Sequence, residues 1–353
     1  MGTNDNKDSQ HNSERVEDKR PIVVSGARPT GDIHLGNFAG AVANWVALQD
    51  TYQCFYFIAD YHALTTHYQD TSELRRRTLN MLADYLACGI DPDKTTLFLQ
   101  SSIPEHAELS LLLSMLTPVS WLERNPTYKD LINQVTSLEI RTLGFLGYPC
   151  LMAADVLIYR AAFVPVGEDQ LPHLELAREI ARRFNFLYGT VFSEPEALLT
   201  KSRVLPGTDG RKMSKTYDNV IAFSDTPDMV RRKVMSMVTD PARIHKTDPG
   251  HPEICTVFSM HQEFNPNEVE EIESLCRAGQ IGCIDCKKRC AARIAEVHTP
   301  IHEKRENLLA DKSYLLDVLN RGSSVARPRA REVLGIAREA MKIGFTPEHL
   351  SNQ

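Results

Sequence analysis

The sequence lacks the features of a membrane-spanning or secreted protein. Its 353 residues include no uninterrupted apolar run of about 18 residues, which a membrane-spanning helix requires. The N-terminal stretch has no apolar core for a signal peptide, and its acidic residues disfavour a transit peptide. Asn6 stands where a myristoylation signal needs serine or threonine. We therefore expect a cytoplasmic protein that makes no use of a membrane, with a disordered polar tail over residues 1–20.

Internal repeats, low-complexity segments and a strong excess of one charge are also absent. The chain has 46 acidic residues against 40 lysines and arginines, 42% hydrophobic residues and 24% charged residues. These values exclude collagen-like, coiled-coil and low-complexity classes. The length is sufficient for a full-sized core and suggests two domains.

A disulfide framework is not expected, because the chain is long and has no secretory signal. Its eight cysteines are therefore expected to be buried, metal-bound or catalytic thiols. Three of them lie singly among apolar neighbours, whereas the other five are crowded together. The single cysteines are Cys54, Cys88 and Cys150, and the crowded ones are Cys255, Cys276, Cys283, Cys286 and Cys290.

Strand-like and helix-like segments alternate in the N-terminal part of the chain. This alternation predicts an α/β fold, with a Rossmann-like parallel sheet and helices on both of its faces. The predicted strands are Pro21–Val24, which breaks at Ser25–Gly26, then Cys54–Ala59 and Thr95–Leu99; the predicted helices run from Gly36 to about Tyr52 and from a cap at Thr71 or Ser72 to Gly89.

Beyond Pro104 the pattern is mostly helical. Two further apolar runs, Ala162–Val166 and Val220–Phe223, are candidates for the last strands of the sheet. From Thr226 onward the periodicity is helical and charged residues are frequent. We therefore predict a Rossmann-like domain over residues 21–220 and an all-helical domain over residues 221–353.

The string SGARPTGDIHLGN, residues 25–37, lies between the first predicted strand and its helix. Ligands bind at the carboxyl ends of parallel strands, and a helix N-terminus offers free N–H groups to phosphate. Glycines here allow a ligand to approach the backbone, a threonine could cap the helix, and an imidazole could face a phosphate oxygen. The alternative is a glycine-rich turn in which the histidine merely caps the helix. The residues concerned are Arg28, Thr30, Gly31, His34, Gly36 and Asn37.

A second string, GTDGRKMSKT, spans residues 207–216. Its glycines predict a mobile loop, on which Lys212 and Lys215 place two cations. Such a loop could close on a triphosphate and follow the charge that develops as the α-phosphate is attacked. The alternative is an exposed basic loop without a catalytic role.

HLGN and KMSKT resemble the two signature motifs, of HIGH and KMSKS type, of class I aminoacyl-tRNA synthetases. The strings IADYHALT, WLERNPTYKD, YPCLMAADVLIY and VPVGEDQLPHLELAREIARRFN are similar to those of bacterial tryptophanyl-tRNA synthetases, and the resemblance covers about residues 21–345. It implies activation of tryptophan by Mg²⁺-ATP, transfer to tRNA(Trp), a homodimer and a helical anticodon-binding region. Catalysis would then rest on positioning and charge stabilisation.

The resemblance also implies roles for individual residues. His34, Asn37, Lys212 and Lys215 would act in catalysis. The ATP site would comprise Arg28, Pro29, Thr30, Gly36, Asn37, Gly167, Glu168, Asp169, Lys212, Met213, Ser214, Lys215 and Thr216. The sequence departs from the family pattern at Arg28, where glutamine is frequent, at Thr216, where serine is usual, and at Leu131, where several relatives have a lysine; Lys129 is therefore a weak ATP-site candidate.

For the amino acid, the resemblance places Asp155 beneath the indole as the acceptor of its N–H. A single fixed acceptor in an apolar pocket would reject a ring that lacks the N–H. Taken alone, Asp155 could instead be a helix cap or a surface acid. Gln170 would meet the α-ammonium group, with Tyr148, Met152 and His62 nearby.

The crowded cysteines suit either a four-cysteine zinc site or a [4Fe-4S] cluster, because spacing alone does not separate the two. Resemblance to the iron-sulfur subgroup of the family favours the cluster, with Cys255, Cys276, Cys283 and Cys286 as ligands. The long gap is two residues shorter here than in that subgroup, so Cys290 could replace Cys255. Reduced thiols without metal are the remaining alternative.

Lys287, Lys288 and Arg289 adjoin Cys286 and could form a basic face for the tRNA anticodon, or merely a solvated helix face. Three other functions compete with tryptophan activation. A tyrosyl-tRNA synthetase would share the fold and several motifs. An RNA-binding regulator would have no use for a mobile loop with two lysines, and a small-metabolite nucleotidyltransferase would commonly lack so large a helical domain.

Overall fold

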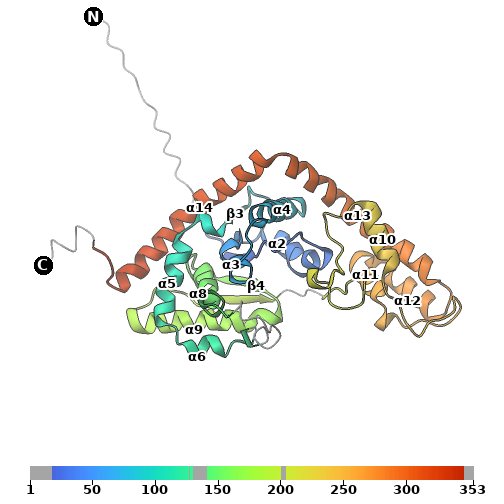
Figure 1. Ribbon diagram of the computed structural model, residues 1–353, viewed down its shortest axis with the longest axis horizontal. Helices are drawn as coiled ribbons and strands as arrows, with labels where there is room; N and C mark the ends of the chain where they lie inside the picture. The colour runs from blue at the N-terminus through green and yellow to red at the C-terminus, as the bar shows by residue number, and fades with distance from the viewer. Residues whose placement is uncertain (1–17, 127, 130–140, 200–203, 346–353) are drawn as a thin grey trace, which may run out of the picture.

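The computed structural model describes residues 18–126, 128–129, 141–199 and 204–345. A parallel sheet with helices on both faces forms one end of the molecule, and helices α10 to α13 form the other (Figure 1). The long helix α14 runs from the helical end back across the sheet end. Within the described ranges, no helix has the length and apolar character needed to cross a membrane.

The sheet has five parallel strands in the order β3-β2-β1-β4-β5. This is the doubly wound order in which the chain moves outward from β1 in both directions. The register pairs Ile22 of β1 with Gln53 of β2, and Val23 of β1 with Phe163 of β4. The strands are β1 (Ile22–Ala27), β2 (Gln53–Ile58), β3 (Thr95–Leu99), β4 (Phe163–Val166) and β5 (Glu196–Leu199).

Side chains alternate between two hydrophobic cores, one on each face of the sheet. In β2, Tyr56 and Ile58 join the core shared with α4 and with α10 to α13. Phe55 and Phe57 join the opposite core, shared with α5, α8, α9 and α14. The helices of the sheet region are α1 (Leu35–Asn37), α2 (Ala43–Leu48), α3 (Asp60–His67), α4 (Leu74–Ala87), α5 (Glu105–Leu116), α6 (Val119–Glu123), α8 (Leu143–Leu157) and α9 (Leu171–Tyr188), with a π-helix at Phe38–Val42 and 3₁₀ turns at Gln100–Ser102 and Glu168–Gln170.

From Thr226 onward, the regular elements of the described residues are all helices, as the periodicity predicts, although residues 237–251 between them form a loop. Helix α14 returns to the sheet and packs across β3. A Cβ on Gly322 would overlap the carbonyl oxygen of Leu97, so only glycine allows the helix to approach this strand so closely. The helices are α10 (Pro227–Ser236), α11 (Thr256–Phe264), α12 (Val269–Arg277), α13 (Cys283–Ala310) and α14 (Lys312–Ala340), and 3₁₀ turns lie at Lys215–Tyr217, Pro252–Ile254 and Pro266–Glu268.

Local sequence signals misplace several element boundaries. The segment Val220–Phe223 is not a strand of the sheet: it forms one isolated antiparallel bridge, between Ala222 and His34. The strand missing from the prediction is β5, whose side chains are half-buried or exposed and therefore form no strong apolar run.

Two helix and strand ends also differ from prediction. The first strand continues through Ser25 and Gly26 to Ala27, because its ladder with β2 extends to Ile58. Helix α4 begins after Glu73 without a side-chain cap, so neither Thr71 nor Ser72 caps it.

Candidate active site

The two predicted motif regions of the sheet meet where the strand order reverses. β1 leads directly into residues 28–37, and β4 leads directly into Gly167–Gln170. Since β1 and β4 are neighbours and the chain leaves them in opposite directions, their carboxyl ends open a crevice in which doubly wound proteins bind ligands.

His34 is the N-cap residue of α1, so Thr30 does not cap this helix. Its Nδ1 accepts a hydrogen bond from the backbone N–H of Asn37 at 3.2 Å, and the Asn37 side chain accepts one from the N–H of His34. Because Nδ1 accepts, the neutral ring carries its proton on Nε2. Burial, and then the charge of Lys215, lower the pKa of His34 to about 4. The imidazole is therefore neutral at physiological pH, with one nitrogen capping the helix and the other left as a donor.

The second motif packs directly against the first. The backbone N–H of Gly36 donates to the sulfur of Met213 at 3.3 Å. Gly31 has a φ of +144°, and a Cβ on it would lie 3.2 Å from Nζ of Lys215. Gly31 thus permits both an unusual backbone conformation and the close approach of the lysine side chain.

The loop that carries the two lysines is held by Asn219. The Asn219 side chain accepts from the N–H of Ser214 and donates to the carbonyl oxygen of Lys212. Lys212, Lys215 and Thr216 are all exposed. The side chain of Lys215 nevertheless lies against Gly31 of the first motif. Desolvation by the surrounding protein lowers the pKa of Lys215, although nearby Asp32 and Asp84 oppose this effect.

Asp155 is buried in α8 and is neither a helix cap nor a surface acid. Its Oδ1 accepts from Gln100 Nε2 at 2.7 Å and from His106 Nδ1 at 2.6 Å. Its Oδ2 lies 2.8 Å from His62 Nε2. Burial raises the pKa of this carboxyl, but hydrogen bonds from His106 and His62 together lower it by more, and the net direction is downward.

This network leaves Oδ2 of Asp155 with fewer partners than Oδ1, and a carboxylate oxygen can accept two hydrogen bonds. The arrangement can therefore receive one more donor. Gln100 and His106 escaped the sequence analysis. The signal that could have found them is their position in the sequence, since both follow β3 at the same edge of the sheet as the predicted sites.

The other residues predicted to bind the amino acid lie at two places. The ring of Tyr148 is 6.5 Å from that of His62 and 5.6 Å from that of His173, beside the Asp155 network. Met152 is half-buried on the same helix as Asp155. Gln170 is exposed after β4, where its amide donates to the Asp169 carboxylate at 2.9 Å.

The remaining ATP-site candidates lie around the crevice. Arg28 donates to the hydroxyl of Thr66 at 3.5 Å, and burial lowers its pKa. Pro29 is buried and lines a small hollow between the first motif, α3 and α4. Lys129 is exposed, and Leu131 lies outside the described residues. Glu168 and Asp169 are exposed beyond β4, and Gly167 precedes them at its end.

The four cysteines predicted to bind metal come together from three helices. Cys255 precedes α11, Cys276 lies in α12, and Cys283 and Cys286 lie in the first turn of α13. Burial, followed by the proximity of the other three sulfurs, raises the pKa of the Cys286 thiol to about 12. Cys290, in contrast, is buried in the hydrophobic core, where its sulfur lies 4.0 Å from the carbonyl oxygen of Val257.

A cation stands beside these sulfurs. Nη1 of Arg243 is 3.9 Å from the sulfurs of both Cys276 and Cys283, and its buried Nε has no hydrogen-bond partner among the described residues. In the described ranges, no group of three or more His, Cys, Asp or Glu side chains is arranged so that it could hold a metal ion.

The basic residues next to Cys286 already have hydrogen-bond or ion-pair partners within the protein. Lys287 donates to the carbonyl oxygen of Met235, Lys288 faces Asp285, and Arg289 pairs with Glu271 at 2.9 Å.

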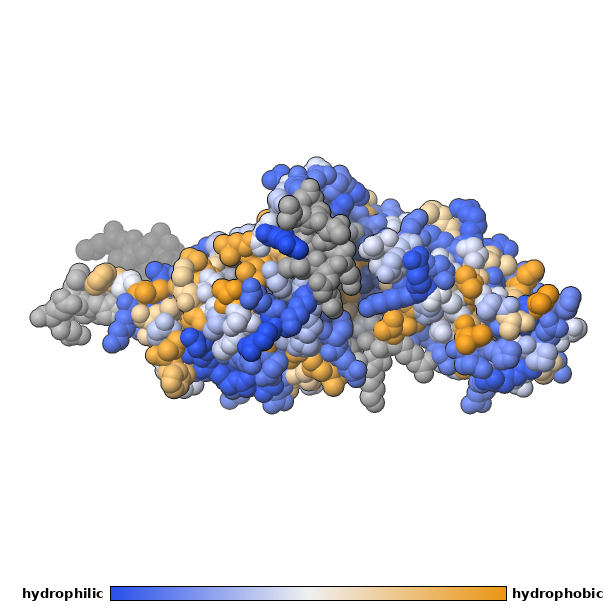
Figure 2. Space-filling model, turned by 60° about the horizontal axis from the view of Figure 1, so that its bottom comes forward, coloured by the Kyte–Doolittle hydropathy of each residue, from blue (hydrophilic) through white to orange (hydrophobic). Residues whose placement is uncertain are grey.

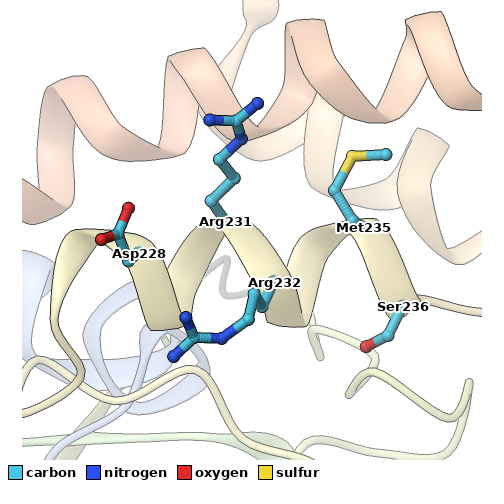
Figure 3. A pocket seen from close by; sticks show the side chains of 5 residues that line it. All are labelled: Asp228, Arg231, Arg232, Met235 and Ser236. Carbon is cyan, nitrogen blue, oxygen red and sulfur yellow. The ribbon is translucent and has the colours of Figure 1, made fainter.

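Helix α10 also carries basic side chains. A surface hollow is lined by five residues of this helix alone, and in the described part of the chain Arg231 and Arg232 have no ion-pair partner (Figure 3). Its lining residues are Asp228, Arg231, Arg232, Met235 and Ser236.

Exposed hydrophobic side chains gather on the sheet end of the molecule. Figure 2 shows them over the part where Figure 1 places α5, α6, α8 and α9. Leu143 and Phe186 are 84% and 88% exposed. Others from these helices are Leu111, Met115, Val119 and Leu187.

Comparison with known families gives one match over most of the chain. Residues 17–299 match the family of class I tRNA synthetases (W and Y). The chain is similar to the tryptophan–tRNA ligase of Thermotoga maritima, with 48% identity over 92% of this chain and 99% of the relative. It is also similar to that of Aquifex aeolicus, with 44% identity over 91% of this chain and 99% of the relative.

Solved structures agree with this match. The tryptophanyl-tRNA synthetase of Campylobacter jejuni, solved with ADP and tryptophan, superimposes with a TM-score of 0.83 at 35% identity, covering 91% of this chain and 100% of that one. The tyrosyl-tRNA synthetase of Archaeoglobus fulgidus reaches a TM-score of 0.65 at 20% identity, which demonstrates a shared fold alone.

Proposed function

This chain belongs to the class I tRNA synthetases of the tryptophan and tyrosine family, in which it is a tryptophan–tRNA ligase, and we propose how its own residues perform that reaction. In the first step the tryptophan carboxylate attacks the α-phosphate of Mg²⁺-ATP. The bond from the α-phosphate to the bridging oxygen breaks, and pyrophosphate leaves. In the second step a ribose hydroxyl at the 3′ end of tRNA(Trp) attacks the acyl carbon, and AMP leaves.

One observation supports the proposed ATP site: the second motif packs against the first, which follows the carboxyl end of β1. His34 has an Nε2–H donor in the first motif, and the side chain of Lys215 lies against Gly31. Fixed donors of this kind stabilise charge that develops on a transferring phosphoryl group. Lys215 would follow the charge onto pyrophosphate, while Lys212 would move in from the surface as the loop closes.

The other ATP-site residues would surround the nucleotide. Gly36 would let the phosphates approach the backbone at the start of α1, and Asn37 would contribute the NH₂ of its side-chain amide, because the backbone N–H groups of these two residues already donate to Met213 and His34. Gly167, Glu168 and Asp169, at the end of β4, would face the adenosine and its ribose. The rest of the proposed shell consists of Arg28, Pro29, Thr30, Met213, Ser214 and Thr216.

Asp155 would accept the indole N–H at Oδ2. Its other oxygen already has two donors, and His62 holds Oδ2 from one side. The carboxylate is therefore fixed before the substrate arrives, and a ring without an N–H would leave a buried acceptor unpaired. Tyr148 and Met152 would line the ring, and Gln170 would meet the ammonium group.

The test is amino-acid-dependent ATP–pyrophosphate exchange on the purified protein. We expect exchange with tryptophan and none with tyrosine or without an amino acid. Exchange with tyrosine would contradict the proposed pocket around Asp155. Exchange that survives Lys215→Ala unchanged would remove the second motif from the mechanism.

For the cysteines, we propose a [4Fe-4S] cluster held by Cys255, Cys276, Cys283 and Cys286. Four thiolates suit either a zinc ion or a cubane cluster, and the resemblance to the iron-sulfur subgroup favours the cluster. Arg243, whose Nη1 is 3.9 Å from the sulfurs of Cys276 and Cys283, would supply positive charge beside it. When bound, the cluster would cross-link α11, α12 and α13.

Metal and sulfide analysis of anaerobically purified protein tests this assignment. We expect four iron atoms per chain, as the proposed cluster requires, with a brown absorbance that Cys283→Ser abolishes and Cys88→Ser leaves intact. Zinc without iron would contradict the cluster. Loss of iron in Cys290→Ser but not in Cys255→Ser would mean that Cys290, and not Cys255, is the fourth ligand.

The helical residues 221–353 are proposed to contact the anticodon region of tRNA(Trp), with the Rossmann-like residues 21–220 as the catalytic part. Arg231 and Arg232 on α10, without ion-pair partners in the described ranges, suit phosphate contacts better than Lys287 to Arg289, which already have partners (Figure 3). Arg231→Ala should therefore raise the KM for tRNA more than Arg289→Ala, without changing exchange. Equal effects would contradict this preference.

We also propose that the protein forms a homodimer in the cytoplasm. The exposed hydrophobic area on α5, α6, α8 and α9 is the surface best suited to a second copy. Analytical ultracentrifugation should give twice the chain mass of 39.8 kDa. Phe186→Asp should shift the equilibrium to monomer, and the equally exposed Ile244→Asp should not.

A further inference from the structure

One face of α13 carries three polar side chains directed at the sheet region. His298, His302 and Arg305 are spaced so that they share a face of the helix. His298 donates to the carbonyl oxygen of Ala222 at 2.9 Å, and His302 donates to that of Phe223 at 2.8 Å. This helix packs along α4 and α10 (Figure 1).

Arg305 is buried, with 4% of its surface exposed. Its Nε donates to Oδ1 of Asp84 at 2.7 Å, and Asp84 lies fully buried in α4. Its Nη1 donates to Glu306 at 2.5 Å. A buried ion pair is weak evidence for stability, because the cost of desolvation can exceed the Coulomb attraction. The pair therefore calls for a role beyond stabilising the fold.

Asp84 and Phe223, which this face of α13 contacts, form hydrogen bonds with the backbone of Ile33, the residue that precedes His34. The backbone N–H of Ile33 donates to Oδ2 of Asp84 at 2.9 Å. The carbonyl oxygen of Ile33 accepts from the N–H of Phe223 at 3.0 Å. Both backbone hydrogen-bonding groups of Ile33 are thus fixed by residues that α13 contacts directly.

Arg305 also reaches the carboxylate beside Lys215. Its Nη2 is 3.6 Å from Oδ1 of Asp32, which in turn accepts from Asn80 at 2.9 Å. Asp32 follows Gly31, the residue over which the Lys215 side chain lies. Asp32 therefore lies close to two cations, Arg305 on α13 and Lys215 in the second motif.

We propose that Arg305 is a positioning residue for adenylate formation, which fixes the backbone before His34 through Asp84 and the resting place of Lys215 through Asp32. When ATP arrives, Lys215 moves from Asp32 to the phosphates, and Arg305 keeps Asp32 neutralised. The helix that starts at the cysteine site thereby sets the geometry of both motifs. This inference rests on the proposed roles of His34 and Lys215.

The test compares Arg305→Met/Asp84→Asn with Arg305→Lys and with Arg321→Met as the matched control. The double variant removes both charges of the buried pair, while the amide oxygen introduced by Asp84→Asn can still accept from the N–H of Ile33. Arg321 forms only exposed ion pairs, with Asp93 and Asp317. Thermal unfolding, ATP affinity by calorimetry and single-turnover adenylate formation are measured for each.

A positioning role predicts that the double variant unfolds within a few degrees of the unsubstituted protein but forms adenylate roughly tenfold or more slowly. Arg305→Lys keeps the charge but loses the planar guanidinium group, so its rate of adenylate formation should lie between those of the unsubstituted protein and the double variant. Unchanged rate and ATP affinity in a folded variant would overturn the proposal. If the double variant does not fold, Arg305→Lys decides by the same criterion.

These outcomes separate the inference from the proposed function. Absence of tryptophan-dependent exchange in the unsubstituted protein would count against the function. ATP affinity remains a readout for Arg305 in that case, because the motifs meet the phosphates whichever amino acid is bound. Equal ATP affinity in the unsubstituted protein and in all variants would then overturn the positioning role.

Discussion

Two buried aspartates, one in each helical layer of the sheet, behave in opposite ways. Asp155 in α8 has side-chain partners on both oxygens, and its pKa is lowered despite burial. Asp84 in α4 pairs with a full cation, yet burial raises its pKa to about 6. The direction in which the pKa of a buried carboxyl shifts thus depends on all the donors that surround it, and not only on whether one partner carries a full charge.

The contrast has a structural cause in the Arg305 pair. Burial lowers the pKa of Arg305, but Asp84, Asp32 and Glu306 together outweigh this effect, and the net direction is upward. Asp84 has lost its hydration entirely, and among the described residues it receives Arg305 and one backbone N–H in exchange. On one side of the sheet, Asp155 thus provides a fixed hydrogen-bond acceptor that suits an amino acid. On the other side, Asp84 fixes the backbone before His34, which suits the binding of phosphates.

Lys215→Ala is the change with the largest expected effect on the Asp84 side. Loss of a cation aimed at the developing phosphate charge should slow adenylate formation roughly 100- to 1000-fold while the KM for tryptophan stays the same. Pre-steady-state quenched flow measures this rate. Lys94→Ala, which breaks only the exposed pair with Asp50, is the control. A comparable loss in that control would contradict the assignment.

Asp155→Asn tests the other layer. Whichever oxygen is replaced, an amide NH₂ faces a donor that the carboxylate now accepts from, so the indole acceptor is lost or misplaced. We expect kcat/KM for tryptophan to fall roughly 100-fold with the KM for ATP unchanged. Steady-state exchange measures both. Asp50→Asn should leave both constants unchanged, and an increased KM for ATP in Asp155→Asn would mean that the layers do not serve separate substrates.

His34 offers two substitutions that separate its two nitrogens. His34→Asn can retain the acceptor at the position of Nδ1 and thus the cap on α1, whereas His34→Gln can retain the donor at the position of Nε2. Loss of the cap should lower the free energy of unfolding by about 1 kcal/mol in His34→Gln only. Adenylate formation should fall roughly 100-fold in His34→Asn and less in His34→Gln. The reverse order in the kinetic assay would contradict Nε2 as the phosphate donor.

Asp84→Asn gives the smallest expected effect, in the pH dependence of stability. The carboxyl has a folded pKa of about 6 against an ordinary value of 3.8, so the folded state holds an extra proton between these pH values. Stability from this group is present below pH 3.8 and is lost as the pH rises through about 6. The stability of the unsubstituted protein relative to Asp84→Asn should therefore fall by roughly 1–3 kcal/mol across this window.

Urea unfolding at several pH values measures that difference. Arg305, Asp32 and Lys215 face the carboxyl and stay charged across this range, so they do not produce the slope. A flat difference between the two proteins would mean that Asp84 remains ionised throughout this range, and would remove the contrast between the layers.

Local periodicity is sufficient for much of the fold. It predicts the strand Thr95–Leu99 with the bounds that the structure has, because two β-branched threonines and the three apolar residues that follow them form a short strand-like run. The prediction is wrong at β5, an edge strand without such a run, and at Val220–Phe223, whose apolar residues face the first motif instead of a neighbouring strand. Periodicity reports burial, and burial alone does not distinguish a sheet strand from a packed loop.

The sequence by itself determined the fold class, the two motifs and the presence of a cysteine group, because each depends on residues close together in the chain. Only the tertiary structure decided which groups meet. Gly36 and Met213 are 177 residues apart, and Asp84 and Arg305 are 221 apart. Gln100 and His106 become partners of Asp155 only when β3 and α8 pack together. Such contacts leave no periodic trace in the sequence, since each is set by the packing of whole elements and not by the residues beside it.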